Sequence, residues 1–79
     1  MAGRPPKTID ESTYAGRFAA RLRLLRTKNK LAVEEVAAAI GVESYVWYKW
    51  EDGRREPSID QFPAIAAALG CKPRQLLPE

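Results

Sequence analysis

The stretch LAVEEVAAAIGVESYVWYKWEDG, residues 31–53, carries two short helical patterns on either side of a glycine. In the first pattern the apolar residues recur at the spacing of one helix face: Val33, Val36, Ala37 and Ile40. The second pattern spans residues 44–51. Gly41 can end the first helix, because glycine adopts a left-handed backbone conformation at little steric cost. The stretch therefore predicts two helices joined by a tight turn.

A helical wheel divides the second of these helices into an apolar face and a polar face. Val46, Trp47 and Trp50 share the apolar face, which we expect to pack on the core. The opposite face carries Ser44, Tyr45, Tyr48 and Lys49. A helix with a buried back and a hydrogen-bonding front fits the major groove of DNA, which is about 12 Å wide and exposes the base edges.

The flanking segments predict two more helices and a final turn. Residues 13–29 form an apolar stripe at helical spacing: Tyr14, Phe18, Leu22 and Leu25. A later helix, with a cap at Ser58 or Asp60 and an end at Gly70, would bury Phe62, Ile65, Ala66 and Leu69. A last turn in residues 72–78 is expected to pack two leucines on the core, Leu76 and Leu77. The pattern contains no strand signal and predicts an all-α fold.

The composition limits the chemistry open to this chain. Its 79 residues include one cysteine, Cys71, and no histidine, which excludes an internal disulfide, an ordinary zinc site and a triad with a histidine base. A chain this short forms one small core with little room for a substrate pocket. We therefore expect no enzyme, no catalytic residue, no metal, no cofactor and no small-molecule substrate.

The lone cysteine and the lack of long apolar runs indicate where in the cell the protein is found. A single thiol suits a reducing compartment, and we expect Cys71 to act as apolar filler in the core. No apolar run approaches the roughly 18 residues that a membrane-spanning helix needs. The sequence thus predicts a cytoplasmic protein without a membrane partner.

The net charge of +3 is unevenly distributed. Residues 1–31 carry eight basic and two acidic side chains, whereas residues 32–79 carry five basic and eight acidic ones. A basic half beside an acidic half indicates a surface for a polyanion. A solvated, charged helix is the alternative explanation.

Three runs of sequence resemble the Cro and phage-repressor type of helix-turn-helix DNA-binding protein: RLRLLRTKNKL (21–31), LAVEEVAAAIGVESYVWYKWEDGRREPS (31–58) and IAAALG (65–70). The resemblance extends over residues 17–78 and includes the small Ala37 where two helices cross and Gly41 in the turn. It implies a five-helix, lambda-repressor-like DNA-binding domain over residues 13–79. The preceding residues, 1–12, are rich in proline, glycine and charge and have no apolar period, which predicts a flexible basic arm.

The resemblance also implies a role for individual residues. Residues 44–51 would be the recognition helix, whose base contacts come from Ser44, Tyr45 and Lys49, with Tyr48 flanking them. Phosphate contacts would come from backbone amides and side chains of the next loop, at Gly53, Arg54 and Arg55. For the two arginines, a solvated loop is the alternative. The family pairs an arginine late in the first helix with a glutamate that closes the recognition helix, here Arg26 and Glu51. A free surface charge or a phosphate contact is the alternative for Arg26.

The N-terminal run GRPPK, residues 3–7, is similar to the AT-hook, a strand that lies in the narrow minor groove of A·T-rich DNA. An arginine meets enhanced negative potential there. Arg4 and Lys7 are therefore candidates for a minor-groove contact, although Ala2 stands where the first arginine of that motif would be. A solubilising tail is the alternative.

The sequence departs from the family pattern at two points. Ala32 and Val33 stand where the helix before the turn usually opens with a capping residue and a glutamine that contacts phosphate. Glu43 and Asp52 bring negative charge next to the expected DNA surface. Both departures keep a second class of function open, a protein-interaction adaptor that uses residues 43–52 as its contact surface.

The expected function is that of a sequence-specific DNA-binding transcriptional regulator of the repressor type, bacterial or phage-encoded and associated with the nucleoid. Its partner would be double-stranded DNA, bound as a homodimer on an inverted repeat with half-sites about one helical turn apart.

Overall fold

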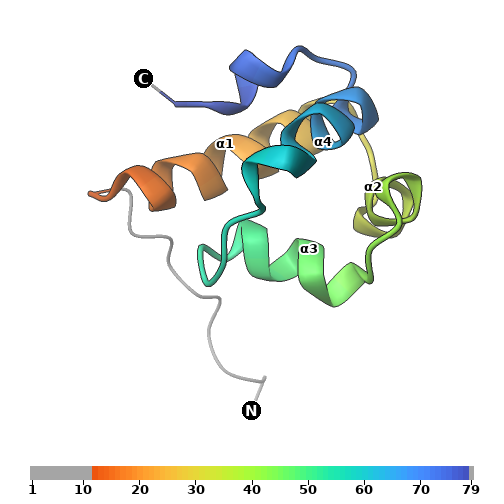
Figure 1. Cartoon of the computed structure of the whole chain (residues 1–79), viewed down its shortest axis with the longest axis horizontal. Helices are drawn as coiled ribbons and strands as arrows, with labels where there is room; N and C mark the ends of the chain where they lie inside the picture. Colours follow the sequence, from red (N-terminus) through yellow and green to blue (C-terminus); the bar gives the residue numbers. More distant parts are fainter. Residues whose placement is uncertain (1–11, 79) are drawn as a thin grey trace.

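Four α-helices and two 3₁₀ helices make up residues 12–78, the part of the chain that the computed structural model describes (Figure 1). In chain order they are α1 (Tyr14–Lys28), α2 (Val33–Ile40), α3 (Ser44–Glu51), η1 (Ile59–Gln61), α4 (Phe62–Leu69) and η2 (Pro73–Leu76). No strand occurs within the described residues, so the all-α prediction is confirmed. The expected fifth helix is instead the 3₁₀ turn η2, because the backbone becomes extended at Leu77.

The core lies where the four α-helices meet. Trp47, Leu22, Ile65, Leu69 and Leu76 are its largest fully buried apolar side chains. At one end of the core Phe18 of α1 stacks on Phe62 of α4, with ring centroids 5.5 Å apart. This packing joins the first and the last α-helix, and α2 and α3 pack against these two helices.

Two apolar residues are exposed: Tyr14, which belongs to the apolar stripe of α1, and Leu77, which was expected to pack on the core. Tyr14 is 49% exposed, because it is the first residue of α1 and reaches past the core; its hydroxyl donates to the Pro78 carbonyl oxygen at 2.8 Å. Leu77 is 44% exposed, whereas its neighbour Leu76 is fully buried. The extended backbone at Leu77 turns consecutive side chains to opposite sides, so only one of the two leucines can face the core.

The ends of the helices follow the signals in the sequence. The Thr13 hydroxyl accepts from the Gly16 amide at 3.0 Å and caps α1. Ser58 precedes the one-turn η1, which leads directly into α4. The Ser58 backbone N–H donates to the Gln61 side-chain oxygen at 2.9 Å. The helix predicted after Ser58 is thus present, but its first turn is of the 3₁₀ type.

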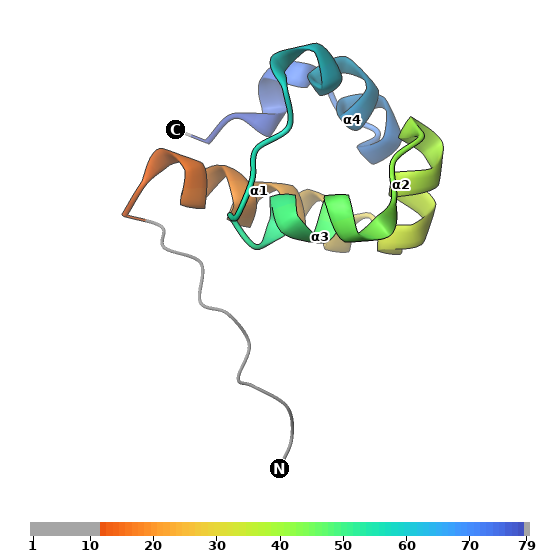
Figure 2. The same ribbon diagram turned by 60° about the horizontal axis from the view of Figure 1, so that its bottom comes forward.

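Three residues, 41–43, connect α2 to α3. Gly41 has φ +78°, the left-handed conformation that only glycine adopts at little cost. The Val42 amide then donates to the Ala37 carbonyl oxygen at 3.0 Å and closes the end of α2. The turn sends α3 along one edge of the molecule, where Figure 1 and Figure 2 show it as the green ribbon.

Candidate nucleic-acid interface

The inner face of α3 is anchored by two tryptophans. Trp47 is 0% exposed and Trp50 is 3% exposed, and their rings pack against each other with centroids 5.5 Å apart. Val46 is partly buried against the same core. The helix therefore cannot rotate about its axis without removing two large apolar side chains from the interior, which fixes the direction that its other face takes.

The outer face of α3 carries the residues that were predicted to contact bases. Tyr45 is 60% exposed and Tyr48 is 47% exposed, whereas Ser44, the first residue of the helix, and Lys49 are half-buried. The Lys49 ammonium lies 5.2 Å from the centroid of the Tyr45 ring. The structure thus brings aromatic rings, a hydroxyl and a cation together on one outward surface.

A groove of about 320 Å³ runs beside this surface. Its α3 side is formed by Tyr45, Val46, Lys49 and Trp50, and its other side by Arg55, Glu56 and Gln61. The groove places Arg55, a predicted phosphate contact, across from the outer face of α3. Gln61 was not singled out in the sequence, because no periodicity places the residues of η1 next to those of α3.

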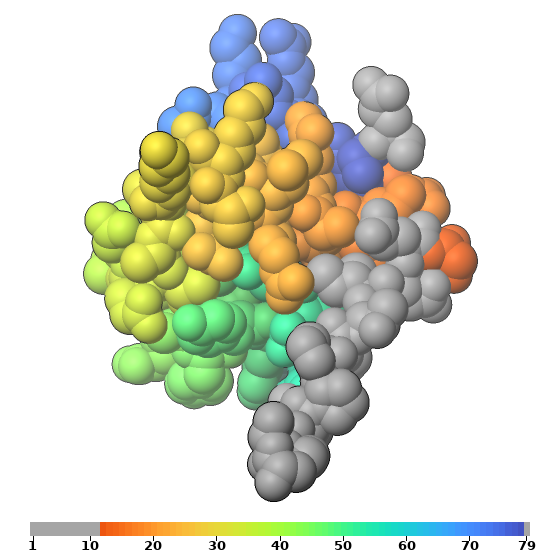
Figure 3. Space-filling view, turned by 180° about the vertical axis from the view of Figure 1, so that it is seen from behind, coloured from red at the N-terminus to blue at the C-terminus, as the bar shows by residue number. Residues whose placement is uncertain are grey.

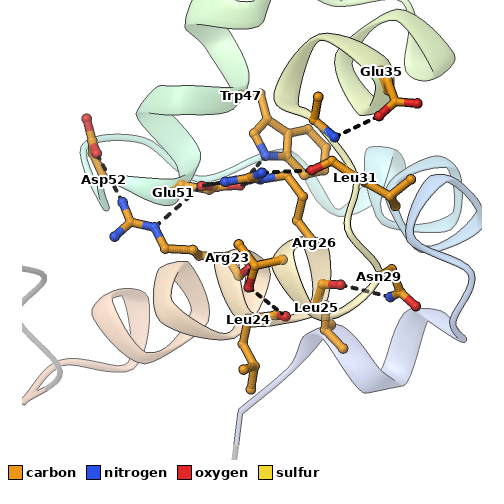
Figure 4. Close-up of polar contacts among 12 residues, drawn as sticks. Arg23, Leu24, Leu25, Arg26, Asn29, Leu31, Glu35, Trp47, Glu51 and Asp52 are labelled. Carbon is orange, nitrogen blue, oxygen red and sulfur yellow. Dashed lines mark hydrogen bonds and ion pairs between the residues drawn. The ribbon is translucent and has the colours of Figure 1, made fainter.

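The predicted pair of Arg26 and Glu51 forms the polar centre of the domain (Figure 4). The Arg26 guanidinium donates to both Glu51 carboxylate oxygens, at 2.5 and 3.1 Å, and also to the Leu31 carbonyl oxygen at 2.8 Å. Glu51 is only 2% exposed, and its hydrogen bond raises the pKa of Arg26 above the ordinary value. One arginine thereby links α1, the segment before α2, and the last residue of α3.

Sequence reasoning missed two further partners of this network. The Trp47 indole N–H donates to Glu51 at 2.6 Å, and Arg23 lies 3.5 Å from the Glu51 carboxylate. Both could have been found from helical spacing, because Trp47 precedes Glu51 by four residues and Arg23 precedes Arg26 by three. Figure 3 shows why α1 supplies these arginines: seen from behind, α1 in orange lies next to α3 in green.

Asp52 does not present an unbalanced negative charge. Its carboxylate lies 3.8 Å from the Arg23 guanidinium and 3.9 Å from that of Arg54. Two arginines thus offset the carboxylate that the sequence suggested would repel phosphate. Such partly exposed pairs contribute little stability, and they offset part of the negative charge at this end of α3.

The backbone of the loop after α3 is already hydrogen-bonded within the protein. The Gly53 amide donates to the Trp50 carbonyl oxygen at 3.2 Å, and the Arg54 amide to that of Lys49 at 3.0 Å. The longer Arg55 amide contact, at 3.4 Å, reaches the same Lys49 oxygen. The predicted phosphate contacts through these backbone amides are therefore not available in this conformation. Gly53, at φ +75°, shapes the turn, and the Arg54 and Arg55 side chains are both exposed.

The N-terminus of α2 has an acidic residue where the related family places a phosphate contact. Ala32 supplies no side-chain cap, and its backbone N–H donates instead to the Glu35 carboxylate at 2.8 Å. This arrangement satisfies one donor of the first turn and brings a negative charge to it. The start of α2 therefore lacks a capping side chain and carries the Glu35 carboxylate in its place.

Other candidate chemistry is sparse within residues 12–78. No three metal-ligating side chains cluster there, and no helix in that part of the chain has the length and apolarity to cross a membrane. Cys71 is half-buried against the core, and burial raises the pKa of its thiol. The candidate minor-groove residues Arg4 and Lys7 lie outside the described residues.

The turn between α2 and α3, and an α3 with a buried back and an exposed polar face, define a helix-turn-helix domain. A family model described as a helix-turn-helix domain matches residues 17–79, and the chain belongs to this family. The recognised resemblance to Cro and phage-repressor type proteins is thereby confirmed.

Three solved structures similar to this chain are described as a controller protein, a repressor and a hypothetical transcription factor. The restriction-modification controller protein C.AhdI from Aeromonas hydrophila is 34% identical, with a TM-score of 0.73 over 77% of this chain and 92% of its own. The P22 c2 repressor, crystallised in complex with a synthetic operator, is 30% identical, with a TM-score of 0.69 over 76% and 91% of the two chains. The hypothetical transcription factor NHTF from Neisseria is 28% identical, with a TM-score of 0.77 over 94% and 85%. A comparison with curated protein sequences found no match.

Proposed function

We propose that this chain is a sequence-specific DNA-binding transcriptional regulator that places α3 in the major groove of double-stranded DNA. The observation that carries the proposal is the division of α3, whose tryptophans are buried while Tyr45, Tyr48 and Lys49 face outward. Ser44 begins the same helix, where its hydroxyl can also reach a base edge. The similarity to the P22 c2 repressor supports DNA as the partner.

The exposed arginines of the next loop provide the contacts with phosphate. Arg55 lies across the groove from α3, and Arg54 precedes it in the same loop. Because phosphate contacts carry no sequence information, these two residues would set affinity and register. We assign this DNA-binding domain to residues 13–79 and keep the minor-groove role of Arg4 and Lys7 as a separate proposal.

The proposed mode of regulation is repression by occupancy of an operator, in the cytoplasm. A helix of eight residues reads only a few base pairs, so one domain alone would have little selectivity. Two copies on an inverted repeat, with half-sites about one helical turn apart, would double the contacts. The relatives that are named as controller and repressor support this assignment.

One observation favours a protein-interaction adaptor as the second candidate. The carboxylate of Glu35 occupies the N-terminus of α2, where a DNA-binding member of the resembled family is expected to contact phosphate. In that case the exposed tyrosines of α3 would meet another protein, since tyrosine is enriched at protein interfaces. Duplex binding separates the two candidates.

The test compares Lys49→Ala with Arg55→Ala on two duplexes. We expect Lys49→Ala to cost about 1–3 kcal/mol on an operator selected from a random pool and little on a scrambled duplex, because Lys49 reaches bases. Arg55→Ala should weaken both equally and lower the slope of log affinity against log salt by about one. Fluorescence anisotropy at several salt concentrations measures both effects.

Lys72→Ala is the matched control. Lys72 is an exposed lysine that directly precedes η2, and η2 lies across the molecule from α3 (Figure 1). Removal of the Lys72 side chain should change neither affinity nor salt slope. Equal losses on both duplexes for Lys49→Ala would identify it as a phosphate contact. Absence of binding to any duplex at low salt would reject the DNA-binding proposal and favour the adaptor.

A further inference from the structure

We propose that Tyr45 acts as a positioning residue for Lys49: its ring holds the ammonium group in place for base recognition. This inference rests on the proposed function. It adds that one tyrosine of the outer face affects specificity through its neighbour rather than through a base contact of its own.

The geometry of α3 brings the two side chains together. Tyr45 and Lys49 are four residues apart, so they lie one turn apart on the same side of the helix. The Lys49 Nζ lies 5.2 Å from the centroid of the Tyr45 ring, inside the range of about 6 Å over which a cation is attracted to an aromatic face. No carboxylate within residues 12–78 forms a salt bridge with Lys49.

This contact restricts a side chain that is otherwise very mobile. Lysine has a long aliphatic chain and loses much rotamer freedom when its ammonium is fixed on a base. A ring that already restrains the ammonium in the free protein reduces the rotamer entropy that the lysine loses when the protein binds DNA. Lys49 is half-buried and Tyr45 is 60% exposed, and both side chains line the groove beside α3.

Two substitutions of Tyr45 distinguish the role of its ring from the role of its hydroxyl. Tyr45→Phe keeps an aromatic face and is expected to leave operator affinity within about twofold of the wild type. Tyr45→Leu removes that face and is expected to weaken operator binding by about two- to fivefold, the equivalent of an exposed cation–π contact. The loss should relax preference at the same base pair as Lys49→Ala, and it should vanish in a Lys49→Ala background.

A second measurement needs no DNA. In the wild-type chain the Tyr45 ring current should shift the NMR signals of the Lys49 ε-methylene protons upfield, and Tyr45→Leu should abolish this shift. Tyr48→Leu is the matched control, because Tyr48 is also an exposed tyrosine of α3, whereas within residues 12–78 the ring that lies over the Lys49 ammonium is that of Tyr45. It should leave the shift in place.

Both measurements together distinguish the possible outcomes. An upfield shift combined with a Tyr45→Leu loss that depends on Lys49 supports the positioning role. Absence of the shift in a chain that binds DNA overturns that role but not the proposed function. Equal losses for Tyr45→Phe and Tyr45→Leu would overturn it too, since the hydroxyl would then contact DNA directly. If the shift is present but the wild-type chain binds no duplex, the proposed function is rejected, and the positioning role with it.

Discussion

Replacing Trp47 with alanine is expected to destabilise the domain by about 3–5 kcal/mol, a large share of the roughly 5–15 kcal/mol that a folded domain has. Trp47 is the largest fully buried side chain, and its loss leaves a cavity between α3 and the core. It also removes the indole N–H that donates to Glu51. Urea denaturation followed by far-ultraviolet circular dichroism measures the change in unfolding free energy.

Tyr45→Ala provides the comparison for this substitution. It removes a large aromatic side chain from the same helix, but one that is 60% exposed, so the unfolding midpoint should move little. An unchanged midpoint for Trp47→Ala would show that the inner face of α3 has been assigned wrongly. The outward face would then have to be assigned again, along with its proposed contacts.

Replacing Glu51 with leucine is expected to cost about 3–5 kcal/mol, because it leaves the partly buried Arg26 guanidinium without its counter-charge and the buried Trp47 indole N–H without its acceptor. The double substitution Arg26→Met with Glu51→Leu removes both charges and should be less destabilised than the Glu51→Leu single variant. Urea denaturation of the two single variants and the double variant gives the coupling energy between the residues.

Asp52→Asn tests whether burial of the ion pair is the cause of the large stability loss expected for Glu51→Leu. Asp52 also pairs with arginine, but its contacts are longer and its side chain is 27% exposed, so its loss should cost about 0–1 kcal/mol. If Glu51→Leu were no more destabilising than Asp52→Asn, the pair of Arg26 and Glu51 would not be what holds α1 and α3 together.

Helical spacing was enough to predict the parts of the fold that depend on one helix at a time. The wheel of α3 placed Trp47 and Trp50 inward correctly, since a helix has a fixed period and a single domain has one core to face. Two apolar residues, Tyr14 in the stripe of α1 and Leu77 in the last turn, are exposed. Periodicity shows which face of a segment is apolar but does not show where the core ends, and both residues lie at the margins.

The candidate site was predictable in its residues but not in its contacts. The outer face of α3 follows from the wheel, and the structure adds the Tyr45 ring over the Lys49 ammonium. The hydrogen bond from Gly53 to Trp50 could not be foreseen, because it depends on how the loop closes after Glu51. The groove could not be foreseen either, because it depends on how the chain between α3 and η1 brings Arg55 and Gln61 across from α3.

The most direct test of the proposed interface is an NMR titration of the isotope-labelled chain with an operator duplex selected from a random pool. We expect the largest chemical-shift changes on the outer face of α3, at Ser44, Tyr45, Tyr48 and Lys49, and at the loop residues Arg54 and Arg55. Signals of η2, across the molecule from α3, should stay in place (Figure 1). Shift changes confined to α4 and η2, or none at all at a saturating concentration of duplex, would contradict the assignment of α3 as the recognition helix.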